Sequence, residues 1–206
     1  MKKIYLFYKD LIYQNRNWLY FIVTLAVIWA VAGFFLSASF PELFPRFVEF
    51  MNSVFEQALG ALEFDSDLDL ALALFRQNMT ATLYDLFFGL FFGIVPVLSI
   101  ALNFFALGFL SGPIVSTDPI YAHITIPIIF LSVAPHGIFE IPAIFLASAF
   151  GFRFGWAWFL PSASGKRWTV FKQSFFDVLK ILPLVFVLLV FAAVIEAFVT
   201  GRLLGV

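Results

Sequence analysis

Residues 18–36 read WLYFIVTLAVIWAVAGFFL, an apolar run that contains no charged side chain. About 20 such residues in a helix are enough to cross the hydrocarbon layer of a membrane. Trp18 and Tyr20 stand near the start of the run, where amphipathic rings favour the headgroup layer. The run is longer than the core of a secretory signal, which has about 7 to 15 residues. We therefore expect an uncleaved membrane anchor.

The composition of the whole chain is that of a membrane protein. Of its 206 residues, 63% are hydrophobic and 12% are charged, and the mean hydropathy is +1.00. A soluble globular protein is excluded, because its surface would need far more charge. The net charge of −1 offers no broad basic surface for nucleic acid, and the lack of cysteine excludes a disulfide framework. We expect an all-α, polytopic transmembrane helical bundle that forms a single membrane domain over residues 1–206.

The rest of the chain predicts about five spans and two surface segments. Residues 1–17 are basic and aromatic, which predicts an interfacial helix on the membrane surface. Residues 41–79 are acidic and carry a periodic apolar stripe, which predicts extracytoplasmic amphipathic helices. Ser66 resembles the N-cap of the second of these helices, which we expect to be short. We expect a second span at 80–107 and a last span at 175–198.

Residues 120–158 are too long for one crossing and too short for two ordinary helices with a loop. Pro127 and Pro135 interrupt this stretch, so we expect a broken or re-entrant region between them: a short crossing followed by a return helix that begins near Pro135 or His136. Pro135 and Gly137 would shape the turn.

Lysine and arginine gather before the first span and around the connection before the last span. The positive-inside rule places both groups in the cytoplasm. Five crossings then put residues 41–79 and the C-terminus outside the cell membrane, with the N-terminus inside. The basic residues that carry this prediction are Lys2, Lys3, Lys9, Arg16, Arg153, Lys166, Arg167, Lys172 and Lys180.

Three ionisable side chains stand out within apolar segments. His136 and Glu140 are four residues apart, so a helix places them on one face, where they can share a proton or hold a cation. Glu196 lies inside the last span and would complete the cluster if the two helices are neighbours. The alternative is a structural role, in which Glu140 bonds to the backbone or to Arg153. A catalytic zinc site is less favoured, because His123 shows no pairing with His136.

Small residues recur every four positions along the predicted return helix and allow a second helix to approach closely. The partner is either the shorter pair Gly89 and Gly93 or the same helix of a second copy in a homodimer. We favour internal packing. The stripe consists of Ala143, Ala147, Gly151 and Gly155.

The nine residues PHGIFEIPA, 135–143, with Gly151 and Gly155 beyond them, resemble the signature of the stage II sporulation protein M family. The segment VIEAF, 194–198, and the asparagines Asn78 and Asn103 resemble family positions in the same order. The resemblance implies a multi-span protein that, in spore formers, anchors peptidoglycan-degrading partners at the septum. On this basis His136, Glu140, Glu196, Asn78 and Asn103 are the expected intramembrane polar cluster.

We consider three functions. The first is a non-enzymatic scaffold or accessory protein that binds membrane or extracytoplasmic proteins and needs no cofactor. The second is a transporter or channel for a proton, ion or small solute, in which His136, Glu140 and Glu196 line the path. The third, a metal-dependent membrane hydrolase, is least favoured, because it requires a bound metal and His123 shows no pairing with His136. The chain also has no nucleophile elbow, nucleotide loop or dinucleotide motif, which disfavours an autonomous enzyme. We favour the scaffold, because these polar groups are too few to line a continuous path.

Overall fold

The computed structural model describes residues 2–59, 66–115, 119–160 and 167–200, and every regular element within them is helical. The helices are α1 (Lys2–Gln14), α2 (Arg16–Ser39), α3 (Phe44–Leu59), α4 (Asp67–Phe88), α5 (Ile94–Ser111), α6 (Pro119–Trp156) and α7 (Arg167–Ile195), with short turns at Pro41–Leu43, Gly112–Val115 and Glu196–Thr200. The predicted all-α class is confirmed. Predictions that concern Glu63, Asp65, Lys166 and the last residues of the chain lie outside the described residues, as do the side chains of Glu56 and His123.

Among the residues that the structure describes, four helical segments are long and apolar enough to cross a membrane. They are Arg16–Ser39, Ile94–Ser111, Pro135–Trp156 and Arg167–Val199. Their outer surfaces carry large exposed apolar side chains, such as Trp29, Leu102 and Phe191. An apolar exterior of this kind is stable in lipid, so the structure has the surface of a multi-pass membrane protein.

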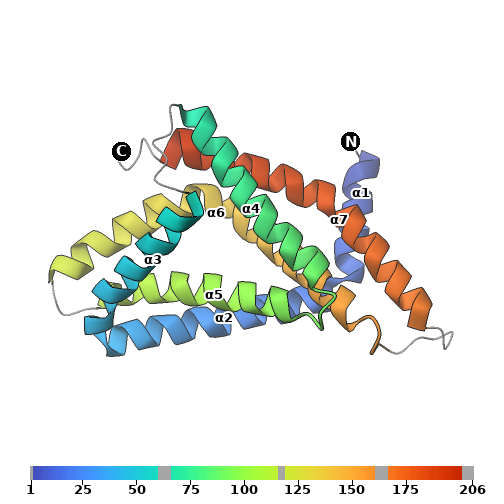
Figure 1. Cartoon of the computed structure of the whole chain (residues 1–206), viewed down its shortest axis with the longest axis horizontal. Coiled ribbons are helices and arrows are strands. Elements are labelled where there is room, and N and C mark those ends of the chain that lie inside the picture. Colours follow the sequence, from blue (N-terminus) through green and yellow to red (C-terminus); the bar gives the residue numbers. More distant parts are fainter. Residues whose placement is uncertain (1, 60–65, 116–118, 161–166, 201–206) are drawn as a thin grey trace.

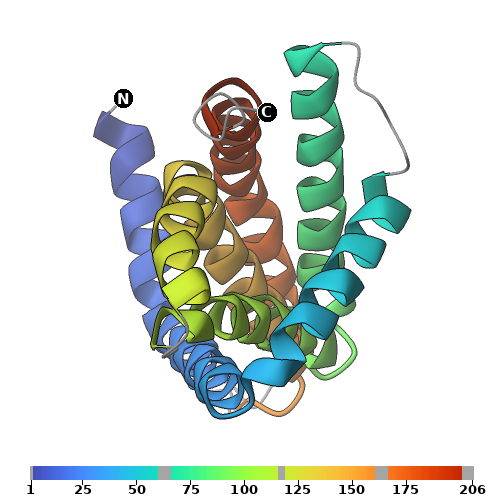
Figure 2. The ribbon, with the colours of Figure 1, turned by 90° about the vertical axis from the view of Figure 1, so that its left-hand side faces the viewer.

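The helices change direction along the chain in a simple order. Following the colours in Figure 1, α2, α5 and α7 run from right to left, whereas α4 and α6 run from left to right. α2 and α5 are parallel neighbours: Trp29 lies against Phe105, and further along Ser37 lies against the backbone of Gly112. Figure 2 shows α1 on one side, α3 and α4 on the other, and α6 and α7 between them.

The predicted single span at 80–107 is wrong. Residues 80–88 belong to α4, the chain reverses at Gly89–Gly93, and α5 begins at Ile94. Phe92 and Gly93 have positive φ angles of 56° and 71°, the left-handed conformation that lets a helical chain turn back. α4 also corrects the expected short helix. Its predicted N-cap, Ser66, accepts a hydrogen bond from the backbone N–H of Asp69, but the helix continues to Phe88.

The structure also has no turn between a short crossing and a return helix at residue 135, contrary to the prediction. α6 is one helix from Pro119 to Trp156, so Pro135 and Gly137 are helical and do not form a turn. The ribbon nevertheless bends sharply near its middle (Figure 1). Proline inside a helix lacks the N–H that would bond to the preceding turn, and its ring clashes with that turn, which bends the helix.

The second half of α6 is the centre of the molecule. On one side Ala143, Ala147 and Phe150 belong to a core with α4 and α7; on the other Ala149 and Phe152 belong to a core with α2 and α5. These side chains are at most 8% exposed. The bend of α6 and its buried half therefore set where the polar side chains of the candidate site lie.

Candidate functional site

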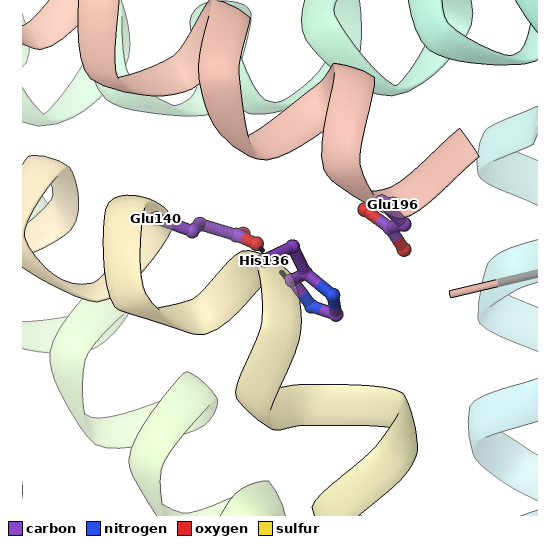
Figure 3. A group of neighbouring side chains, drawn as sticks. All are labelled: His136, Glu140 and Glu196. Atoms are coloured by element: carbon purple, nitrogen blue, oxygen red, sulfur yellow. Dashed lines mark ion pairs between the residues drawn. The ribbon is translucent and has the colours of Figure 1, made fainter. Parts of the chain in front are cut away.

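His136, Glu140 and Glu196 come together between α6 and the end of α7. One ligand atom from each side chain lies within 4.8 Å of the others, and all three residues are half-buried. The imidazole Nε2 of His136 is 3.7 Å from a carboxylate oxygen of Glu140. Figure 3 shows the two α6 side chains on one face of the helix and the Glu196 carboxylate facing them from α7.

Two local features of the chain place these groups. A spacing of four residues sets His136 and Glu140 one turn apart, and Figure 3 shows His136 next to the bend of α6. Glu196 begins the π-helical turn Glu196–Thr200, which follows directly on α7. A π turn is wider than an α turn and occurs frequently at functional sites. The three side chains therefore meet where both helices depart from regular α geometry.

The chemistry of the cluster is that of proton sharing or cation binding. It contains two carboxylates and one imidazole, and its buried His136 Nδ1 atom has no hydrogen-bond partner in the described part of the chain. Charges at membrane depth cost several kcal/mol unless they are neutralised or paired. Protons or a bound cation would neutralise the two carboxylates of the cluster.

The asparagines take different places. Asn103 is exposed on α5 and donates to the backbone oxygen of Ser99, 2.8 Å away, so it is not part of the cluster. Asn78 is half-buried on α4. The prediction that Asn103 belongs to the intramembrane polar cluster is therefore wrong: its donor is used within its own helix.

A second polar network joins α6 and α7 to the junction of α1 and α2. Arg153 donates to Asp177 at 2.7 Å and also to the side chain of Asn15, while Lys180 lies 3.0 Å from the other oxygen of Asp177. Asn15 and Asp177 are only 2% and 3% exposed. Sequence reasoning used Lys180 only as a topology signal, considered Arg153 also as a partner of Glu140, and missed Asp177. The alternative pairing of Glu140 with Arg153 does not occur, because Asp177 and Asn15 engage this guanidinium.

A third buried polar contact joins α4 to α6. The hydroxyl of Ser148 donates to a carboxylate oxygen of Asp85 at 2.8 Å, and the two residues are 0% and 3% exposed. Sequence reasoning missed Asp85. The signal that could have found it is its place as the only charged residue in the apolar run 77–117.

The predicted small residues meet within one chain. A Cβ atom at Gly89 would overlap the carbonyl of Gly151, and one at Gly155 would overlap the carbonyl of Gly89 and the nitrogen of Gly93. Ala143 and Ala147, further along the same stripe, are fully buried. These glycine surfaces are thus used between α4, the turn that follows it and α6, and they are not free to bind a second copy.

Comparison with known proteins places the chain in a family. An uncharacterised protein from the archaeon Methanocaldococcus jannaschii is 29% identical over 112 residues, which cover 54% of this chain. This chain spans about 60% of the length of that relative. No solved structure matches significantly. Residues 19–201 match the Stage II sporulation protein M family, and this match covers most of the chain. The chain is a multi-pass membrane protein that belongs to the Stage II sporulation protein M family.

Proposed function

We propose that this protein is a membrane scaffold or accessory protein that binds a partner protein through α3, on the extracytoplasmic side. The observation that carries the proposal is a pair of exposed apolar side chains on this helix, Phe50 and Val54, which form an apolar ridge. Phe47 packs inward on Phe109 of α5, with the ring centroids 4.3 Å apart. Phe50 and Val54, one turn apart from each other, are 60% and 42% exposed. Figure 2 shows α3 on the outside of the bundle.

The charge around this ridge favours a protein partner over the lipid surface. Glu49, next to Phe50 in the chain, is exposed, and Glu42 is exposed in the turn before α3. Arg46, one turn before Phe50, is the exposed basic residue of the same stretch. Carboxylates are repelled by the negative surface potential of membranes that contain anionic lipids. An apolar ridge flanked by carboxylates instead fits a protein that offers an apolar groove with a basic rim.

The arrangement of buried polar groups favours a scaffold over a transporter. Ser148 on α6 faces α4, where it bonds to Asp85, whereas Arg153 on α6 faces α7, where it bonds to Asp177. The groups thus belong to separate helix contacts and are satisfied by each other. A conduction path would need polar groups that follow one another along a shared opening. A scaffold role also agrees with the partner-anchoring function that the family resemblance implies, and it requires no enzymatic activity.

We further propose that the N-terminus is cytoplasmic and that the turn between α2 and α3 is extracytoplasmic. This orientation follows from the lysines of α1 and the basic start of α7 under the positive-inside rule. It places α3 where extracytoplasmic or membrane proteins can reach it.

Site-specific photocrosslinking in intact cells tests the scaffold proposal. A photoreactive phenylalanine analogue at Phe50 should give a discrete protein adduct. The same analogue at Leu102, which is 70% exposed on α5, serves as the matched control and should give no such adduct. Glu49→Lys should reduce the Phe50 adduct at least several-fold, because it reverses the charge beside the ridge.

Three results would contradict the proposal. Lipid adducts at Phe50 without a protein adduct would show that α3 only covers the membrane surface. Equal protein adducts at Phe50 and Leu102 would show collision without a defined docking surface. Proton flux in liposomes that Glu140→Gln abolishes would favour the transporter instead.

A further inference from the structure

We propose that His136, Glu140 and Glu196 form a binding site for one divalent transition-metal ion, with Zn²⁺ as the best fit. This site is independent of α3 and of the scaffold function proposed for it. The three residues supply one imidazole nitrogen and two carboxylate oxygens, and these atoms lie within 4.8 Å of one another.

The distances suit metal ligands better than a direct ion pair. Zn²⁺ binds histidine nitrogen at about 2.0–2.1 Å and carboxylate oxygen at about 2.0–2.2 Å, so two ligands of a tetrahedral ion lie about 3.4 Å apart. His136 Nε2 and Glu140 Oε2 are 3.7 Å apart, which is too far for a hydrogen bond and close to that ligand spacing. Small side-chain rotations would bring all three atoms onto one ion.

The charges of the cluster also call for a cation. Glu140 and Glu196 approach each other from different helices in a half-buried place. Arg153 of α6 and Lys180 of α7 are both engaged by Asp177. A divalent ion would neutralise two carboxylates in one step, and the imidazole favours Zn²⁺ over Mg²⁺ and Ca²⁺, which prefer oxygen ligands alone.

The unpaired nitrogen of His136 is a second, separate indication. Its Nδ1 atom is buried and has no hydrogen-bond partner in the part of the chain that the structure describes. Buried polar atoms normally have a partner, because an unsatisfied one costs about 1–3 kcal/mol. An ion bound at Nδ1 would remove this cost directly, whereas an ion bound at Nε2 would fix the proton on Nδ1, which then needs an ordered water as its acceptor.

The geometry implies an open coordination site. Three protein ligands leave one position of a tetrahedral ion for water or another small ligand, as in catalytic zinc sites. The ligands come from the bend of α6 and from the widened turn after α7, so a metal would also join these two helices at their irregular ends. The site would therefore hold the end of α7 against α6.

Metal binding by the purified full-length protein tests the proposal. The protein is extracted in detergent, stripped with a chelator, and titrated with Zn²⁺ against a chromophoric competitor, and bound metal is counted by elemental analysis. We expect about one Zn²⁺ per chain. Glu140→Gln and Glu196→Gln should each weaken binding more than about tenfold, because the loss of even an outer-shell partner costs about 10–100-fold.

Glu49→Gln is the matched control, because it removes an exposed carboxylate from α3 and should leave Zn²⁺ binding unchanged. Co²⁺ gives an independent spectroscopic test: its visible absorption should show tetrahedral coordination in the wild type and lose that band in His136→Gln. Circular dichroism and gel filtration identify any variant that fails to fold, and Glu196→Gln at the end of α7 is the mildest of the three. Stoichiometric binding that survives in folded Glu196→Gln, no binding by the wild type, or preference for Mg²⁺ would overturn the proposal.

Discussion

At the level of single residues, Asp177 is a buried carboxylate that forms ion pairs with two basic side chains. Its carboxylate bonds to Arg153 and Lys180 while it is only 3% exposed. Removing one partner of a buried ion pair costs about 3–5 kcal/mol, because the remaining charge loses its compensation. We expect Asp177→Leu to lower the midpoint of thermal unfolding in detergent strongly, and the double variant with Arg153→Met to recover part of the loss. Lys180→Met should change it little, since the Lys180 side chain is 46% exposed. Equal losses for Asp177→Leu and Lys180→Met would contradict this interpretation.

The same residues show what the sequence can and cannot predict. The proximity of His136 and Glu140 follows from helical geometry, because four residues make about one turn. The partner of Arg153 could not be read in this way. Asp177 stands between basic residues in a region whose charge predicts a cytoplasmic boundary. No local pattern indicates that α7 packs against α6 at the height of Arg153. Glu196 was named as a conditional member of the cluster, since its approach depends on the packing of α7 and on no local pattern.

At the level of helices, the contact between the Gly89 turn and α6 depends on the absence of side chains. A Cβ at Gly151 would overlap the carbonyl of Asp85, and one at Gly89 would overlap the carbonyl of Gly151. Overpacking costs typically about 1–3 kcal/mol, so we expect Gly151→Ala and Gly89→Ala each to lower the midpoint of thermal unfolding by several degrees. Ala32→Val is the control, because it adds bulk to an exposed position of α2. Unfolding midpoints that match for all three variants would show that α6 can shift without cost.

The prediction of helices succeeded where a local pattern decides them and failed where packing does. The Ser66 cap could be read because its hydrogen bond lies within four residues. The sequence does not reveal the reversal at Gly89–Gly93, because residues 86–97, LFFGLFFGIVPV, are apolar throughout. An apolar composition does not distinguish a turn whose glycines pack against α6 from a continuous span. Conversely, Pro127 and Pro135 predict a break, whereas the helix continues through both and bends near its middle (Figure 1).

For the whole molecule, these two errors offset each other in the predicted topology. The sequence suggested one crossing at 80–107 and two at 120–158, whereas the structure has two helices, α4 and α5, in the first region and one, α6, in the second. In Figure 1 the helices alternate in direction, so that α2 begins at the right and α7 ends at the left, which is the parity of five passes. α4 is not among the four most apolar segments, because of its charged and amide residues. Two of its polar residues, Thr82 and Asp85, are each 3% exposed, which is how polar groups are tolerated at membrane depth.

This arrangement makes a topology prediction that differs from the sequence prediction at one point. If α4 crosses the membrane, the turn after it reaches the same side as the start of α7. Because the chain has no cysteine, single cysteines can be introduced without background labelling. We expect Phe91→Cys and Arg167→Cys to react with a membrane-impermeant maleimide only in inverted vesicles. Glu49→Cys should react in cells whose outer envelope is permeabilised while the cell membrane stays intact. Phe91 is 57% exposed, so its thiol should be reachable wherever the turn lies in water. A single span at 80–107 would instead bury position 91 in lipid and leave it unreactive from both sides, and labelling of Glu49→Cys and Arg167→Cys from the same side would overturn the orientation itself.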